Sequence, residues 1–82
     1  MRREYLTLPD LDITDAPTIL SLWFVKEGTL VAEDEPVVEV MAGSITVDLP
    51  APIDGILVHK YIAPGESITV GQRLALIEEN EG

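Results

Sequence analysis

Residues 37–55 read Val-Val-Glu-Val-Met-Ala-Gly-Ser-Ile-Thr-Val-Asp-Leu-Pro-Ala-Pro-Ile-Asp-Gly. Both arms of this stretch contain apolar residues of the kind that suits half-buried strands, namely Val38, Val40, Ile45, Val47 and Leu49. The residues between the arms, Ala42–Ser44, are small, and Gly43 can adopt a positive φ without steric cost. Pro50 and Pro52 end the second arm because proline has no N–H to donate. The stretch therefore predicts a β-hairpin with Ala42, Gly43 and Ser44 at its tip.

The flanking sequence predicts further short strands separated by turns. Glycine and proline interrupt the chain repeatedly, and no window shows sustained apolar spacing of three and four residues, so no helix is expected. Residues 10–17 form a polar connection, and residues 32–36 form an acidic loop that leads into the hairpin. The expected strands outside the hairpin are 2–8, 18–26, 30–31, 56–62, 67–68 and 73–78.

An internal repeat organises these strands. Placing Gly28 on Gly65 shifts the chain by 37 residues and brings apolar residues into correspondence. The corresponding pairs are Ile19 with Ile56, Leu20 with Leu57, Phe24 with Tyr61, Val25 with Ile62, Val31 with Ile68, Val37 with Leu74 and Val40 with Ile77. Two copies of one strand unit predict a quasi-two-fold sandwich of two packed sheets. The hairpin tip is expected at one end of the sandwich and both termini at the other.

Length and charge limit the possible functions. The 82 residues suit a single domain, 1–82, with a core over about 5–79 and frayed termini. Fifteen acids and five bases give a net charge of −10, which repels nucleic acid and anionic membrane surfaces. The chain has no cysteine and therefore no thiolate chemistry, and no apolar run approaches the ~20 residues of a membrane helix. A cytoplasmic, monomeric protein is expected.

These features resemble the lipoyl and biotinyl carrier domains of 2-oxoacid dehydrogenase acyltransferases and biotin carboxyl carrier proteins. The turn residues that match the family are Gly28, Pro50-Ala51-Pro52, Gly55, Gly65 and Gly71. The resemblance implies an all-β fold, a flattened barrel or sandwich of two four-stranded antiparallel sheets, known as a barrel-sandwich hybrid. It also implies a lysine at the hairpin tip that is acylated by lipoate or biotin.

The attachment lysine that the resemblance implies is absent from this chain. Counting back from Pro50 places Ser44 at the position of that lysine and Gly43 where lipoyl domains have aspartate. Met41 lies too early in the hairpin to begin the Met-Lys-Met of biotinyl domains. We therefore expect neither lipoate nor biotin on the tip formed by Ala42, Gly43 and Ser44.

Two other lysines supply the amine that an amide linkage needs. Lys26 occupies a Val-Lys-Glu-Gly turn, where carrier domains commonly have a lysine that is not acylated. Lys60 is expected inside the second long strand and is the fallback attachment site. Neither lies at a hairpin tip, so acylation of either is disfavoured.

Other candidate chemistry has simpler explanations. Ser44 is expected to be a turn residue, because a nucleophilic serine needs a nearby base and the chain's histidine, His59, lies in the other repeat. His59 is expected to be a partly exposed strand residue and Trp23 a packing residue. Residues 33–35 are acidic but lack the ligand spacing of a calcium loop, and Asp48 and Asp54 show no paired-carboxylate pattern. No metal site is expected.

These observations favour a stand-alone, non-catalytic binding or scaffold module, related to acyl or carboxyl carrier systems, that binds a protein partner. The alternative is a true lipoyl or biotin swinging-arm carrier, modified at Lys60 or Lys26 or with its tip lysine replaced artificially. A third hypothesis is an enzyme that acts through Ser44, His59 and an acid. It is the least favoured, because a flat sandwich of this size leaves little room for a pocket.

Overall fold

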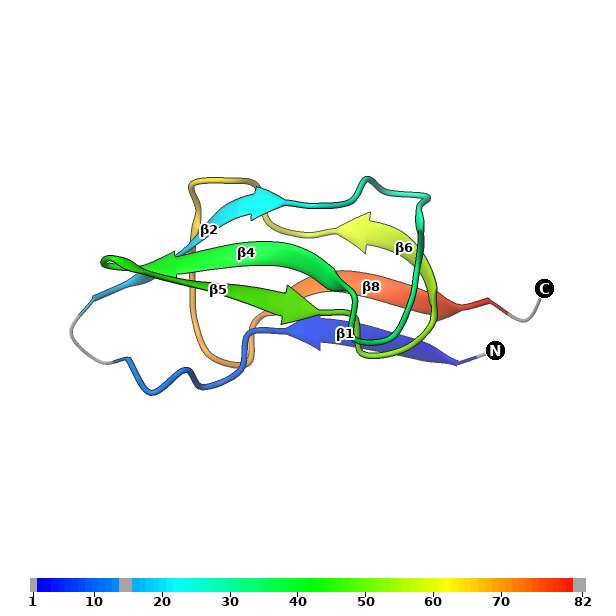
Figure 1. Cartoon of the computed structure of the whole chain (residues 1–82), viewed down its shortest axis with the longest axis horizontal. Helices are drawn as coiled ribbons and strands as arrows, with labels where there is room; N and C mark the ends of the chain where they lie inside the picture. The colour runs from blue at the N-terminus through cyan, green and yellow to red at the C-terminus, as the bar shows by residue number, and fades with distance from the viewer. Residues whose placement is uncertain (1, 14–15, 81–82) are drawn as a thin grey trace.

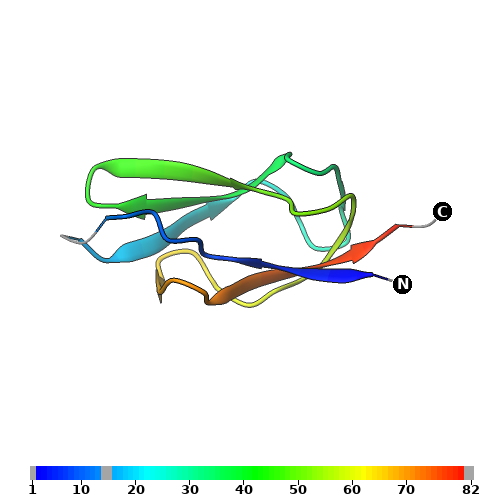
Figure 2. The same ribbon diagram turned by 90° about the horizontal axis from the view of Figure 1, so that it is seen from below.

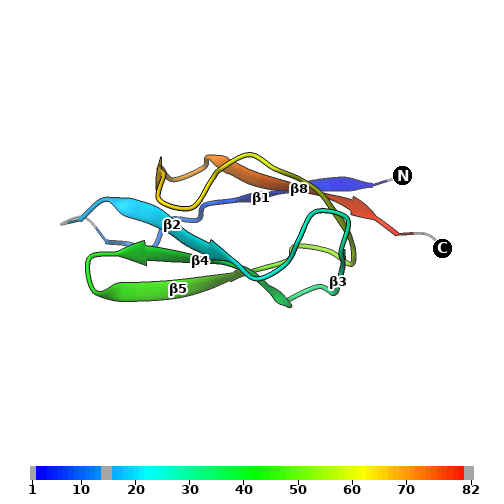
Figure 3. The ribbon, with the colours of Figure 1, turned by 90° about the horizontal axis from the view of Figure 1, so that it is seen from above.

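The computed structural model describes residues 2–13 and 16–80, which form eight β-strands and no helix. The strands are β1 (Arg3–Thr7), β2 (Thr18–Trp23), β3 (Leu30–Val31), β4 (Pro36–Ala42), β5 (Ile45–Pro50), β6 (Gly55–Lys60), β7 (Ser67–Ile68) and β8 (Arg73–Glu79). They form two four-stranded antiparallel sheets, which we call sheet A, ordered β1-β8-β6-β3, and sheet B, ordered β5-β4-β2-β7. The predicted all-β sandwich is confirmed. The two sheets lie as separate layers (Figure 2, Figure 3).

The internal repeat is present in the hydrogen bonds as well as in the sequence. The shift of 37 residues carries β2 onto β6, β3 onto β7 and β4 onto β8. The N–H of Gly28 donates to the Leu57 carbonyl at 2.7 Å, and the N–H of Gly65 donates to the Leu20 carbonyl at 2.8 Å. Each sheet takes strands from both repeats, so β1, β8, β6 and β3 are the pseudo-equivalents of β5, β4, β2 and β7.

The repeat places the hairpin tip and the termini at opposite ends of the molecule. In the pseudo-equivalence just described, the β4–β5 hairpin of sheet B corresponds to the pair of β8 and β1 in sheet A. That pair brings together the beginning and the end of the chain, and the N–H of Glu79 donates to the Arg2 carbonyl at 2.8 Å. Figure 1 shows the hairpin reaching one end of the molecule and both termini at the other, as predicted.

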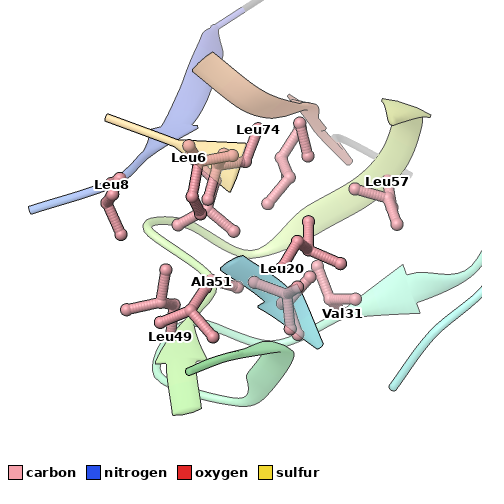
Figure 4. Close-up of a cluster of buried hydrophobic side chains, with 14 of the residues drawn as sticks. Leu6, Leu8, Leu20, Val31, Leu49, Ala51, Leu57 and Leu74 are labelled. Atoms are coloured by element: carbon pink, nitrogen blue, oxygen red, sulfur yellow. The ribbon is translucent and has the colours of Figure 1, made fainter. Parts of the chain in front are cut away.

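One apolar core fills the space between the two sheets. Its largest fully buried side chains are contributed by both layers, as Figure 4 shows, and by both repeats: Leu8, Leu20, Val31, Val37, Val38, Val40, Leu57, Leu74 and Ile77. No polar or charged residue is buried among the residues that the structure describes. Burying one such leucine stabilises the fold by about 1.5–3 kcal/mol.

Several strands end earlier than the sequence predicts. The strands expected over 18–26 and 56–62 end at Trp23 and Lys60, because only one further residue of each keeps a pairing hydrogen bond. These bonds run from Phe24 to Val37 at 2.8 Å and from Tyr61 to Leu74 at 2.9 Å. The chain then turns away through a glycine with positive φ, 88° at Gly28 and 92° at Gly65.

The ends of the domain differ slightly from expectation. The first strand is Arg3–Thr7 rather than 2–8, and the last strand includes Glu79, which pairs with Gly55. Met1 and residues 81–82 of the expected frayed ends lie outside the described residues, as do residues 14–15 of the polar connection. Among the described residues, no helix is long and apolar enough to cross a membrane.

Candidate functional site at the hairpin tip

The hairpin tip is a two-residue turn. β4 ends at Ala42 and β5 begins at Ile45, which face each other across the hairpin and leave Gly43 and Ser44 as the loop. Gly43 has a φ of 61°. A positive φ at the first loop residue is the pattern of the turns that match the twist of paired strands, and glycine adopts it without penalty. The predicted tip of Ala42, Gly43 and Ser44 is confirmed as a turn.

The polar connection between β1 and β2 lies beside this tip. A Cβ built on Gly43 would lie 3.6 Å from the Cβ of Ala16, an ordinary van der Waals separation. Thr18, the first residue of β2, pairs with Ala42. Sequence reasoning missed the position of Ala16, because the 10–17 connection has no counterpart in the repeat and therefore no pattern to locate it.

The tip presents small and apolar groups rather than an amine. Gly43 and Ser44 are exposed, Ile45 is 51% exposed, and Ala42 is buried at 3%. The hydroxyl of Ser44 is the one side-chain polar group of the two-residue loop. A serine ester of a carboxylic acid is more readily hydrolysed than a lysine amide.

Neither lysine lies near the tip in a comparable setting. Lys60 is the last residue of β6, and its Nζ lies 5.0 Å from the centre of the Trp23 ring, within the range of a cation–π contact. Lys26 is exposed in the connection between β2 and β3. Figure 1 shows that this connection lies away from the tip of the β4–β5 hairpin. Trp23 packs against the core and donates its Nε1–H to the Ile62 carbonyl at 3.0 Å, which confirms its predicted packing role.

Ser44 and His59 do not form a nucleophilic pair. His59 lies in β6 of sheet A, whereas Ser44 lies at the tip of sheet B. The Nδ1 of His59 is 3.5 Å from Glu27 Oε2, and the imidazole side chain is 54% exposed, as expected for a strand-surface histidine. Glu27 Oε2 also accepts the backbone N–H of Lys60 at 2.8 Å, so the carboxylate near this imidazole helps to hold the β2–β3 connection in place.

The acidic candidates act as local hydrogen-bond acceptors. Glu35 Oε1 accepts the Ala32 N–H at 3.0 Å, and Asp54 Oδ1 accepts the Glu33 N–H at 2.7 Å. Asp48 instead faces Glu39 across β4 and β5, so the structure does not bring Asp48 and Asp54 together. Within residues 2–13 and 16–80, no three acidic or histidine side chains gather as metal ligands.

Two open depressions lie away from the hairpin tip. One, of about 330 Å³, is lined by Leu30, Val31, Ala32, Glu35, Asp54, Gly55 and Asn80. The other, of about 280 Å³, is lined by Tyr5, Leu6, Thr7, Pro9, Asp34, Leu49, Pro50, Ala51 and Pro52. Neither lining includes Ser44 or His59, so the geometry does not support the hypothesis of an enzyme that uses these two residues.

A comparison with protein families identifies the fold's relatives. The family model of the biotin/lipoyl domain, described as "Biotin-requiring enzyme", matches residues 6–78. The chain belongs to the biotin/lipoyl domain family. A curated biotin/lipoyl relative, the lipoamide acyltransferase component of the branched-chain alpha-keto acid dehydrogenase complex of Pseudomonas putida, is 37% identical over 78 residues, which is 95% of this chain and 18% of the relative.

A second curated relative and two solved structures are also similar to this chain. The succinyltransferase component of the 2-oxoglutarate dehydrogenase complex of Bartonella vinsonii is 32% identical over 73 residues, 89% of this chain and 18% of the relative. The solved lipoyl domain of the Azotobacter vinelandii 2-oxoglutarate dehydrogenase complex shares the fold with a TM-score of 0.73 at 22% identity, over 93% of this chain and 98% of that one. A single-chain long-chain acyl-CoA carboxylase gives 0.76 at 16% identity, over 98% of this chain and 7% of that one.

The match covers only a small part of the two curated relatives. The chain spans 18% of the length of the Pseudomonas putida and Bartonella vinsonii components. By family and fold it is a domain of the lipoyl carrier kind. It combines the hairpin of that family with a Gly43-Ser44 tip.

Proposed function

We propose that this domain is an unacylated member of the biotin/lipoyl family that works as a non-catalytic binding or scaffold module. Its partner would be a protein component of an acyl-transfer or carboxyl-transfer system in the cytoplasm, and the domain would bind as a monomer. The observation that carries the proposal is the two-residue turn Gly43-Ser44, which puts a hydroxyl where the family resemblance implies an amine.

The positions of the two lysines support the proposal. An attachment enzyme must reach a lysine amine that extends freely into solvent. Lys60 ends a strand with its Nζ over the Trp23 ring, and Lys26 lies in a connection away from the hairpin. Neither position reproduces the exposed two-residue tip on which a swinging arm would be free to rotate.

The intact mass of the protein purified from its native cells tests the proposal. We expect the mass of the unmodified chain. An added lipoyl or biotinyl group would instead favour the carrier hypothesis, and fragmentation would locate it on Lys60, Lys26 or another residue. The control is a family member with a tip lysine, purified from the same cells, which must show the added group for an unmodified result to count.

A further inference from the structure

The outer face of sheet A carries a cluster of aromatic side chains that remain partly exposed. The Tyr5 and Tyr61 rings lie 6.2 Å apart between centroids, and the His59 ring meets Tyr61 edge-on at 4.6 Å. Tyr5 and His59 both pair with Leu76 of β8, so these rings share one face of the sheet. Tyr5 is 38% exposed and Tyr61 is 44% exposed, although both are large aromatic residues.

A guanidinium group completes this cluster. The Cζ of Arg73 lies 4.0 Å from the centre of the Tyr5 ring, so the planar group lies against the aromatic face. Arg2 and Arg3 each have a carboxylate partner, Glu4 at 2.9 Å and Glu78 at 3.0 Å. Within the described part of the chain, no such ion pair engages Arg73. Its N–H fork is therefore held in place by an aromatic ring with donors still available.

The pseudo-symmetry shows that the fold does not require this arrangement. The outer face of sheet B offers the same positions, with Asp48 in place of Tyr5 and Pro36 in place of Arg73. Leu22 and Phe24 correspond to His59 and Tyr61. The two sheets share an equivalent strand order and pairing, yet only sheet A has a cation stacked on an aromatic ring at these positions.

The charge distribution distinguishes the two faces in the same way. The strands of sheet A contain three acids and three bases, so the net charge of −10 falls outside them. The strands of sheet B contain Glu39 and Asp48 and no base. The strands of sheet A therefore repel an approaching carboxylate less than the strands of sheet B do, and Arg73 can donate hydrogen bonds to it. A long run of acids would still meet the repulsion of the whole domain.

We propose that the outer face of sheet A, formed by Tyr5, His59, Tyr61 and Arg73, docks a linear protein segment in which one carboxylate adjoins apolar or aromatic side chains. The carboxylate would bind the guanidinium edge, which favours bidentate pairing, and the apolar neighbours would cover the tyrosine rings. This surface is separate from the hairpin tip. It does not depend on whether the tip is acylated, so its test and the intact-mass test fail independently.

A matched pair of peptides tests this surface. One capped peptide contains leucine, glutamate and phenylalanine in succession, and the other has glutamine in place of glutamate. Each is titrated to millimolar concentration into isotope-labelled domain while backbone amide resonances are followed. We expect weak binding that shifts amides of β1, β6 and the start of β8, with the glutamate peptide about threefold tighter, as an exposed ion pair allows.

Two protein variants complete the cycle. Arg73→Gln keeps a long polar side chain and should remove the preference for the glutamate peptide, while Asp48→Asn, at the matched position of sheet B, should leave the preference intact. The proposal is overturned if the two peptides bind equally to the original domain, if Arg73→Gln keeps the preference, or if the shifts lie on sheet B. Absence of any shift at millimolar peptide would also overturn it.

Discussion

Gly55 passes so close to Glu78 that a Cβ on the glycine would overlap the Glu78 carbonyl oxygen and lie 2.8 Å from its carbonyl carbon. Gly55 begins β6 and pairs with β8, so the contact joins two neighbouring strands of sheet A. Both partners are backbone, and neither can rotate aside as a side chain would. Glycine is required at position 55 because there is no room for a Cβ, and not because its φ is positive.

Gly55→Ala is therefore expected to destabilise the domain by about 1–3 kcal/mol, the cost of overpacking a site that cannot relax. Urea denaturation followed by tryptophan fluorescence measures the change. Gly28→Ala is the control, because open space surrounds Gly28 and only its φ of 88° opposes a side chain. That strain costs about 1–2 kcal/mol, which overlaps the cost expected for the Gly55 variant. The amide resonances of β8 therefore serve as a second measurement, and the Gly55 variant should perturb them.

Truncating either of two pseudo-equivalent core leucines should lower the free energy of unfolding by a similar amount. Leu20 and Leu57 are both fully buried, one from each sheet, and each accepts the N–H of a turn glycine through its backbone carbonyl. Leu20→Ala and Leu57→Ala are each expected to cost about 2–5 kcal/mol, with similar values for the two. Equilibrium unfolding of both variants provides the test. A large difference would show that the two halves of the core relax differently around a cavity.

Ser44→Lys should convert the tip into an acceptor for an acyl group. The substitution places a primary amine at the exposed second residue of the two-residue turn and disturbs no buried group. Co-expression with a lipoate ligase followed by intact-mass measurement checks it, and we expect the variant to gain a lipoyl group. Ser67→Lys, an exposed strand position outside the tip, is the control and should remain unmodified. Failure of the tip variant would point to the Gly43 turn itself as unsuitable.

Because of the aromatic cluster on sheet A, the free energy of unfolding should vary with pH in the alkaline range. Partial desolvation, and then the nearby Tyr5 phenol, raise the pKa of Tyr61 above 10.0, although Arg73 and Arg3 act in the opposite direction. The neutral phenol is thus favoured in the folded state. Its contribution is fully present below pH 10 and is lost as the pH rises through the folded pKa.

Ultraviolet titration of tyrosinate in Tyr5→Phe and Tyr61→Phe variants measures this pKa. The Tyr5→Phe variant reports Tyr61, and its pKa should move back toward the usual value when the neighbouring phenol is removed. The Tyr61→Phe variant should lose the extra fall in stability above pH 10. A Tyr61 pKa at or below the ordinary tyrosine value in the unchanged domain would contradict the desolvation described for this residue.

The sequence predicts the fold well because its strongest signals are local or periodic. Pro50 and Gly43 mark the end of a strand and a turn by their own backbone chemistry, and the spacing from Gly28 to Gly65 reveals the repeat. The ends of the long strands were predicted too late, since apolar residues continue past Trp23 after pairing has stopped. Apolar character reports burial, whereas a strand end depends on where the partner strand lies.

The site was predictable only in part, for a related reason. Ser44 was located by counting from Pro50, which is a short local distance. The contact of Ala16 with the tip and the stacking of Arg73 on Tyr5 join residues far apart in the sequence, and neither pair follows the repeat. The packing of an irregular connection and of surface side chains depends on the folded backbone. No spacing in the sequence therefore predicts these two contacts.

The adjacency of Arg2 and Glu79 makes the molecule nearly cyclic. If a short turn joined these two residues and the chain were opened between Gly43 and Ser44, the same eight strands would follow one another in order, starting from β5. The opened hairpin would then supply the two ends of the chain, with β5 first and β4 last. The hairpin tip and the place where β8 meets β1 are thus pseudo-equivalent positions at opposite ends of the fold, and a peptide bond between Gly43 and Ser44 joins the strands at the first of them.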